Sequence, residues 1–211
     1  MKGFVSQMNG SILPRTEIRM EYRRGGISIS IESCNGVYEP SDDSILLADN
    51  VLPSGRILEV GCGTGLISIL CRKMGHPVEA VDINPAAVEC TLANAKRNGV
   101  ELWAHVSDLF SSVTGKFDTV IFNPPYLPVE EEVPGFEQWA GGPDGFKVVR
   151  RFLTDLPRFM DKGGKCYIVL SDLADIDLFM SESRDFSFRT VASTKLFFER
   201  LLLMEVSIRV T

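Results

Sequence analysis

The sequence predicts an α/β fold built around a mostly parallel, doubly wound sheet. From residue 57 onward, short apolar and β-branched runs alternate with segments of helical apolar spacing. This alternation is typical of strand–helix–strand units whose strands lie parallel. In the first unit a glycine-rich turn separates strand from helix, and the next strand ends in a carboxylate. At 211 residues with 45% hydrophobic residues, the chain suits one compact domain.

The segment before the glycine-rich turn predicts a hairpin and a helix. Glu17–Arg23 and Ile27–Ile31 alternate between polar and apolar residues, and two glycines stand between them. Either Ser41 or Asp42 is placed to cap a helix that continues to Val51.

The central unit predicts a ligand-binding loop. The strand Ile57–Val60 leads into glycines at positions 61, 63 and 65, and a helix follows over Leu66–Met74. Glycine tolerates positive φ and lets a ligand approach the backbone, while the start of the helix offers free N–H groups.

The next strand, Val78–Asp82, adds a carboxylate to this loop. Asp82 follows Gly61 by 21 positions, a separation that suits an acid binding a ribose. The glycine pattern differs from those of dinucleotide and phosphate loops, which favours a ligand with a ribose but no pyrophosphate. The alternative is that Asp82 only caps the helix beginning at Pro85.

The rest of the chain continues the alternation and closes with an antiparallel pair. A proline- and glycine-rich loop over Leu127–Gly145 has a length typical of functional loops, and Asp161–Gly164 predicts a turn. The predicted strands are Leu102–Val106, Phe117–Phe122, Lys165–Leu170, Phe186–Thr194 and Leu201–Val210. The predicted helices are Pro85–Arg97, Phe146–Met160 and Asp172–Met180.

Asn123-Pro124-Pro125-Tyr126, at the end of a predicted strand, predicts an amine-binding site. The two prolines fix φ and remove two N–H donors, which leaves the backbone carbonyls of Asn123 and Pro124 free to accept. The Asn123 side chain adds an acceptor, and Tyr126 can cover a flat group. Two acceptors can hold the hydrogens of a planar –NH2. The alternative is a plain turn.

Composition argues against several classes of protein. The net charge of −6 lowers the odds of a nucleic-acid substrate, and Arg23-Arg24 and Arg150-Arg151 are expected in a solvated turn and on an exposed helix face. No segment has the roughly 20 apolar residues of a membrane span, and the start of the chain lacks the pattern of a signal peptide, so a soluble cytoplasmic protein is expected.

Cysteine and histidine usage predicts neither a disulfide framework nor a metal site. The cysteines are odd in number and scattered, without Cys-x-x-Cys spacing. His76 and His105 are expected in a loop and a strand rather than as ligands. The cysteines are Cys34, Cys62, Cys71, Cys90 and Cys166.

Several motifs together resemble a known family. Glu-Val-Gly-Cys-Gly-Thr-Gly resembles the first motif of class I S-adenosylmethionine-dependent methyltransferases, and Asn-Pro-Pro-Tyr resembles the motif of those that modify base amines or glutamine amides. The combination resembles the HemK-like protein-glutamine N5-methyltransferases of the short archaeal and eukaryotic branch, which act on class I translation termination factors. The matching stretches are Val37–Ser44, Glu59–Gly65, Asp82, Ser107–Leu109, Asn123–Tyr126 and Trp139–Gly145.

The resemblance implies a Rossmann-like sheet of seven strands with an antiparallel last strand. Residues 1–36 would form an N-terminal extension with a hairpin, and residues 37–211 the methyltransferase domain. It implies S-adenosylmethionine as cofactor. Ser44 would contact the methionine end, and Glu59, Gly61 and Gly63 would line the methionine and ribose. Asp82 would bind the ribose hydroxyls, and Asp108 with Leu109 would lie at the adenine. Asn123, which also borders the cofactor, would bind the glutamine amide with Pro124 and Tyr126. No metal is implied.

Simpler roles remain open for several of these residues. Glu59 could anchor the glycine turn, Ser44 could cap a helix, and Asp108 could end a strand. Glu130–Glu132 is expected to be a solvated acidic loop, and Phe136 and Trp139 could anchor that loop.

Other functions remain open as well. The alternatives are an adenine N6-methyltransferase on DNA or RNA, a lysine or small-molecule methyltransferase, and a non-catalytic cofactor-binding subunit. Relatives of the branch commonly pair a sheet edge with a small zinc-binding activator, and Leu102–Val106 is the candidate edge here. A monomer or a homodimer is equally compatible with the sequence.

Overall fold

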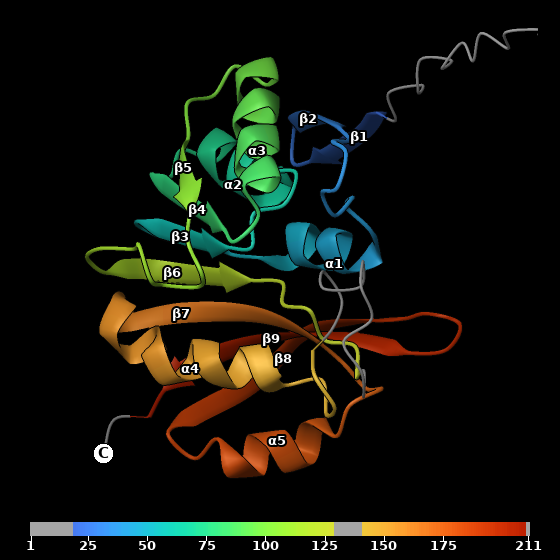
Figure 1. Ribbon diagram of the computed structural model, residues 1–211, viewed down its shortest axis with the longest axis vertical. Coiled ribbons are helices and arrows are strands. Elements are labelled where there is room, and N and C mark those ends of the chain that lie inside the picture. The colour runs from blue at the N-terminus through green and yellow to red at the C-terminus, as the bar shows by residue number, and fades with distance from the viewer. Residues whose placement is uncertain (1–18, 129–140, 210–211) are drawn as a thin grey trace, which may run out of the picture.

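The computed structural model describes residues 19–128 and 141–209 (Figure 1). Each predicted helix and strand overlaps an observed one. The helices are α1 (Asp42–Asn50), α2 (Leu66–Lys73), α3 (Pro85–Arg97), α4 (Lys147–Phe159) and α5 (Ile176–Glu182). The strands are β1 (Arg19–Arg24), β2 (Ile27–Glu32), β3 (Ile57–Val60), β4 (Val78–Asp82), β5 (Trp103–Val106), β6 (Phe117–Phe122), β7 (Met160–Ser171), β8 (Phe186–Lys195) and β9 (Arg200–Ile208).

The main sheet has seven strands in the order β5-β4-β3-β6-β7-β9-β8. Strands β5, β4, β3, β6 and β7 are parallel, whereas β9 is antiparallel to both β7 and β8. The sequence order reverses between β3, which leads out to β4 and β5, and β6. In such sheets ligands bind beyond the carboxyl ends of the strands at this reversal. The predicted fold class is therefore confirmed.

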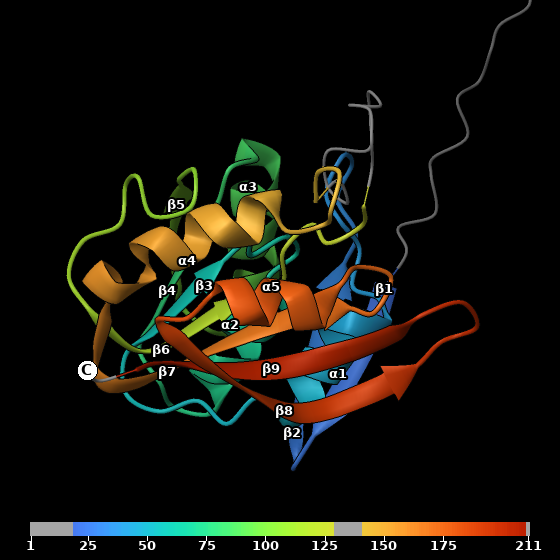
Figure 2. The same ribbon diagram turned by 90° about the horizontal axis from the view of Figure 1, so that it is seen from below.

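Helices cover both faces of the sheet and enclose two apolar clusters (Figure 2). Along β3 and β6, alternate residues contribute to opposite clusters, as the two-residue period of a strand requires. Leu58 and Phe122 pack with α4 and α5, while Ile57 and Ile121 pack with α1, α2 and the hairpin. Burial on both faces explains why these strands are continuously apolar in the sequence.

The β1–β2 hairpin forms a separate two-stranded sheet that lies against α3. Two asparagine side chains, Asn94 of α3 and Asn98 at its C-cap, bond the outer backbone of β2. The Asn98 amide accepts from Ser30 N at 2.9 Å and donates to Ser30 O at 2.8 Å. The Asn94 amide makes the same pair of bonds to Glu32, each at 3.0 Å.

Two local expectations need correction. Residues 161–164 were expected to form a turn before a strand, but β7 already begins at Met160, and its pairing register with β6 shifts across this stretch. Arg24 was expected to be solvated, but its guanidinium donates to Ala48 O and Val51 O at 2.8 and 3.0 Å and closes the end of α1. Carbonyls at a helix end lack partners within the helix, so a nearby guanidinium satisfies them.

Candidate functional site

A cavity of about 580 Å³ lies at the carboxyl ends of β3, β4, β5 and β6. Its size falls within the range of small-molecule sites, roughly 300–1,000 Å³. The structure brings every predicted site residue to its lining. These residues are Ser44, Glu59, Gly61, Gly63, Asp82, Asp108, Leu109, Asn123, Pro124 and Tyr126.

The glycine turn after β3 forms the floor of this cavity. Gly61, Gly63 and Gly65 have φ of 72°, 52° and 89°, a region that residues with a Cβ rarely adopt. A Cβ on Gly65 would lie 3.0 Å from the Thr91 side chain, so this glycine lets α3 pack on the turn. Gly61 and Gly63 line the cavity, whereas Gly65 does not. The first two glycines thus leave backbone open to the cavity, and the third serves packing.

Asp82, at the end of β4, holds the turn from the other side. Its carboxylate accepts from Gly63 N at 3.0 Å and from Asn84 N at 2.9 Å. The alternative that Asp82 caps α3 is wrong, because the Asn84 side chain caps it by accepting from Ala86 N. Burial raises the pKa of Asp82, and these backbone donors oppose the rise. Asp82 therefore presents an acceptor to the cavity next to the glycine turn.

Glu59 is a buried carboxyl beneath the glycine turn. It accepts a bond from the hydroxyl of Ser68 in α2, which ties β3 to that helix. Burial raises the pKa of Glu59 to about 8, and the Ser68 bonds partly offset that rise. Glu59 thus ties together the strand and the helix that flank the turn, and it also lines the cavity.

Asp108 and Leu109 form the cavity wall after β5. Leu109 has φ of 50°, the one positive value among the described residues other than glycine. Such a conformation costs about 1–3 kcal/mol, and strained residues of this kind cluster at functional sites. The Ser107 hydroxyl donates to Leu109 O at 2.8 Å and supports it. Arg151 of α4, which also lines the cavity, donates to the Asp108 carboxylate at 2.8 Å.

Asn123 stands at the end of β6 beside the glycine turn. Its side-chain oxygen Oδ1 is buried, and of the buried side-chain nitrogen and oxygen atoms in the described residues it is the one without a hydrogen-bond partner. Buried polar atoms are nearly always paired, because an unpaired one costs about 1–3 kcal/mol. An acceptor in that state within a cavity indicates a ligand that donates.

Two tyrosines and a carboxylate border the same cavity. The hydroxyls of Tyr38 and Tyr126 both donate to Asp43 Oδ2, at 2.9 and 3.2 Å. Burial raises the pKa of both tyrosines, and the adjacent Asp43 adds to the rise. Both rings therefore stay protonated and serve as donors.

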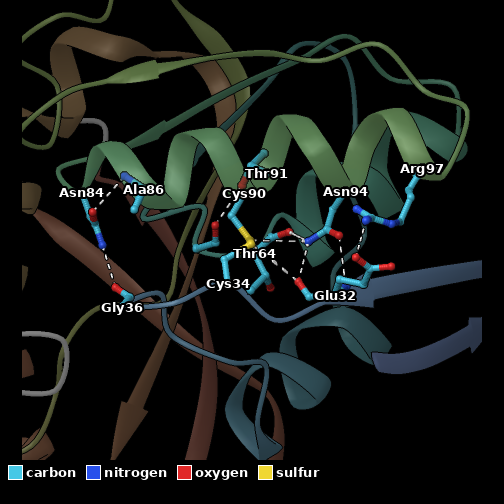
Figure 3. Close-up of a disulfide and its surroundings, with 11 residues drawn as sticks. Glu32, Cys34, Gly36, Thr64, Asn84, Ala86, Cys90, Thr91, Asn94 and Arg97 are labelled. Carbon is cyan, nitrogen blue, oxygen red and sulfur yellow. Dashed lines mark hydrogen bonds and ion pairs between the residues drawn. A yellow bond between two sulfur atoms is a disulfide. The ribbon is translucent and has the colours of Figure 1, made fainter. Parts of the chain in front are cut away.

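A disulfide joins the segment before α1 to α3, which corrects the expectation drawn from the cysteine count (Figure 3). Cys34 and Cys90 lie 56 residues apart in sequence and are bridged. Gly36, two residues after Cys34, lines the cavity, and its carbonyl accepts from the Asn84 side chain at 2.9 Å. The bridge thus fastens one wall of the cavity to α3. Cys62, Cys71 and Cys166 are free and buried.

The histidines lie where the sequence placed them. His76 is in a loop, and His105 lies on β5 with Nε2 3.1 Å from a Glu79 carboxylate oxygen. Within residues 19–128 and 141–209, no group of three or more histidine, cysteine or acidic side chains is arranged to hold a metal. The expectations for Glu130–Glu132, Phe136 and Trp139 lie outside the described residues.

The sequence pattern did not assign several residues that border the cavity. Ile83 is exposed there directly after Asp82, and this adjacency was the available signal. Arg151 was expected only on an exposed helix face. It is indeed exposed, but it also reaches Asp108. Asp43 lies in the matching stretch Val37–Ser44, but nothing in the sequence indicated its bond to Tyr126, which is 83 residues away.

The fold and the cavity define a class I methyltransferase, and comparison with known proteins agrees. The model of the methyltransferase small domain family matches residues 40–198. MJ0928 of Methanocaldococcus jannaschii, provisionally assigned as a protein N5-glutamine methyltransferase, is 42% identical over 177 residues, which are 80% of this chain and 90% of that one. Human methyltransferase HEMK2 is 36% identical over 63% of this chain and 71% of its own. The chain belongs to the methyltransferase small domain family and, within it, to the HemK-like enzymes.

Solved structures confirm the fold. One is a chain of the E. cuniculi Mtq2–Trm112 complex, which is described as responsible for methylation of the eRF1 translation termination factor. It superposes with a TM-score of 0.67 at 24% sequence identity, over 82% of this chain and 99% of that one. The T. thermophilus 16S rRNA N2 G1207 methyltransferase, in complex with AdoMet and guanosine, superposes with a TM-score of 0.66 at 18% sequence identity. The match covers 92% of this chain and 51% of that one.

No helix in the described ranges is both long and apolar enough to cross a membrane.

Proposed function

We propose that this protein methylates the side-chain amide nitrogen of a glutamine, using S-adenosylmethionine, and that the glutamine belongs to the Gly-Gly-Gln motif of a translation termination factor. One observation carries the proposal: the buried, unpartnered Asn123 Oδ1 at the end of β6. A primary amide has two hydrogens to donate, and this oxygen can accept one of them. The Pro124 carbonyl, on the next residue, can accept the other.

The residues present fit the proposed cofactor. Asp82 offers a carboxylate for ribose hydroxyls beside Gly61 and Gly63, whose missing side chains leave room for the methionine part. Asp108 would offer a polar edge, and the exposed Ile83 an apolar cover, to an adenine bound in the same cavity. When bound, S-adenosylmethionine supplies an electrophilic methyl group on a sulfonium.

The chain's own contribution is orientation rather than strong base catalysis. An amide nitrogen is a poor nucleophile because its lone pair is delocalised. Carbonyl acceptors on both of its hydrogens would raise the electron density on nitrogen and fix its direction. Tyr126 would cover the flat amide. Orientation of this kind can supply about 7–11 kcal/mol at best.

The relatives support glutamine as the acceptor. MJ0928 is provisionally assigned to N5-glutamine methylation, and the Mtq2–Trm112 complex is described as responsible for methylation of a termination factor. A net charge of −6 disfavours the alternative of an adenine N6-methyltransferase, since nucleic-acid binding usually needs a basic face. A termination factor as substrate also implies that the protein works in the cytoplasm.

We further propose that a small zinc-binding activator pairs with β5. That strand is an edge of the main sheet, so its outer backbone groups can accept another strand. Two of its apolar side chains are unusually open, with Trp103 55% and Val106 46% exposed. A related methyltransferase occurs in complex with a partner protein, Trm112.

The test is methyl transfer to a candidate termination factor, with mass-spectrometric mapping of the site. The expected product carries one methyl group on the glutamine of Gly-Gly-Gln, and a Gly-Gly-Ala variant of the factor should remain unmodified. Methylation of DNA or RNA adenine instead would overturn the glutamine assignment. Cofactor binding without transfer to any of these substrates would favour a non-catalytic subunit.

Asn123→Ala tests the residue on which the proposal rests. Single-turnover transfer at saturating cofactor should slow by about 10²–10³-fold, by analogy with the loss of one preorganised polar contact, while cofactor affinity should change little. Asn123→Asp keeps an acceptor but places a charge near the sulfonium, so it should also slow transfer. Wild-type rates in Asn123→Ala would mean that the amide is held elsewhere.

A further inference from the structure

The carboxylate of Asp43 joins two segments of the chain beside the cavity. It lies in the first turn of α1 and is 3% exposed. Oδ2 accepts from Tyr38, in the segment before α1, and from Tyr126, in the loop after β6. Oδ1 accepts from both the backbone N–H and the hydroxyl of Ser44.

This bonding pattern excludes some roles for Asp43 and favours another. A carboxylate only accepts hydrogen bonds, and both oxygens here are already engaged by donors of the protein. Asp43 is therefore unsuited to remove a proton from a substrate. It is well suited to hold two rings, since a hydrogen bond to an ionised group contributes more than a neutral one.

We propose that Asp43 is a positioning residue for methyl transfer, which fixes Tyr126 and Tyr38 at the cavity so that the acceptor amide is held beside Asn123. This inference rests on the proposed function, because Tyr126 follows Asn123 by three residues and would pack on the same amide. A displacement of about 1 Å in a positioning group can cost 10²-fold in rate. Loss of Asp43 would let Tyr126 move without removing any group that contacts the substrate.

The primary test is Asp43→Asn, because a carboxamide fills the same space but has only one accepting oxygen. The turnover number should fall by about 10- to 100-fold, whereas KM for the cofactor should change less than about threefold. In a Tyr38→Phe/Tyr126→Phe background the same substitution should have little further effect on turnover, since the two tyrosine hydroxyls that Asp43 holds are already gone. If Asp43→Asn lowered the turnover number by the same factor in this background as in the wild type, the proposal would be overturned.

The chain provides a matched control on the same helix. The Tyr22 hydroxyl donates to Asp49 Oδ1 at 2.8 Å, and neither residue lines the cavity. Asp49→Asn removes a comparable tyrosine–carboxylate bond and should leave the turnover number unchanged. If it slows transfer as much as Asp43→Asn does, the effect is one of general stability and the proposal fails.

A spectroscopic arm separates this inference from the proposed function. With 3-fluorotyrosine incorporated, the ¹⁹F resonance of Tyr126, assigned through Tyr126→Phe, should be single and narrow in the wild type. It should shift or broaden in Asp43→Asn but not in Asp49→Asn. This measurement needs no methyl acceptor, so it decides the role of Asp43 even if no glutamine substrate is methylated. An unchanged Tyr126 resonance in Asp43→Asn would overturn the inference.

Discussion

Removing the Cys34–Cys90 disulfide should cost this protein a large part of its stability. The bridged cysteines are 56 residues apart, so the bond closes a long loop in the unfolded chain. The chain-entropy relation for a loop of this length gives a stabilisation of about 4 kcal/mol. Native proteins of this kind are stable by only about 5–15 kcal/mol. For a chain of about this size, the loss corresponds to a fall of roughly 8–16 °C in Tm.

The native contacts around the bridge should not change this estimate much. Asn94, Asn98 and an ion pair between Arg97 and Glu32 also hold the hairpin on α3, so the folded state should persist without the disulfide. The entropic effect acts on the unfolded chain, which lacks these contacts. Cys34→Ser/Cys90→Ser should therefore fold as the wild type does and unfold at a lower temperature.

The assay compares thermal and urea unfolding of the oxidised wild type and the double variant, each with and without reductant. Reductant should lower the unfolding midpoints of the wild type to those of the variant and leave the midpoints of the variant unchanged. Equal midpoints for the oxidised wild type and the variant would refute the reasoning. So would mass spectrometry that finds both thiols free in the non-reduced protein.

Three further predictions concern the cavity and the sheet edge. Asp82→Ala should weaken S-adenosylmethionine binding on the order of 10–100-fold, because a lost hydrogen bond to a charged group costs about 1.5–3 kcal/mol. Calorimetry that shows unchanged affinity in the folded variant would remove Asp82 from the site. The pKa of Glu59 is raised from 4.5 to about 8, so the native protein keeps a proton that the unfolded chain has released between these pH values. Stability should therefore fall as pH rises from about 4.5 to about 8, by at most ~1.4 kcal/mol per pH unit, and pH-dependent urea titrations should lose this slope in Glu59→Gln. Trp103→Asp should reduce co-purification with an activator, whereas a soluble, monomeric and fully active isolated wild type would rule out an obligatory activator.

Features that depend on nearby residues could be predicted from the sequence. The strand Ile57–Val60, its glycine turn and the Asn-Pro-Pro-Tyr stretch each carry their own signal, because strand burial, positive φ and missing N–H groups are properties of a few adjacent residues. Parallel strands then bring their carboxyl ends to one edge. For this reason the predicted site residues that end or follow these strands, from Glu59 to Tyr126, line one cavity.

Features that depend on distant pairs could not be predicted in this way. Cysteine counting gave no sign that Cys34 would meet Cys90, because the pairing follows from how the hairpin lies on α3. The ion pair of Arg151 with Asp108 spans 43 residues and depends on where α4 crosses the sheet. In each case the side chains are ordinary, and the chemistry arises only after the layers pack.

The asparagines in α3 and at its C-cap have a consequence for solubility. Asn94 and Asn98 are four residues apart on a helix, a rise of about 6 Å, and they pair with Ser30 and Glu32, two residues apart on a strand, a rise of about 6.6 Å. Because the spacings match, two side-chain amides can satisfy the outer backbone of β2 as a neighbouring strand would. An unsatisfied strand is a template on which other chains can add and aggregate. The two asparagines thus shield the outer edge of β2 from intermolecular β-assembly.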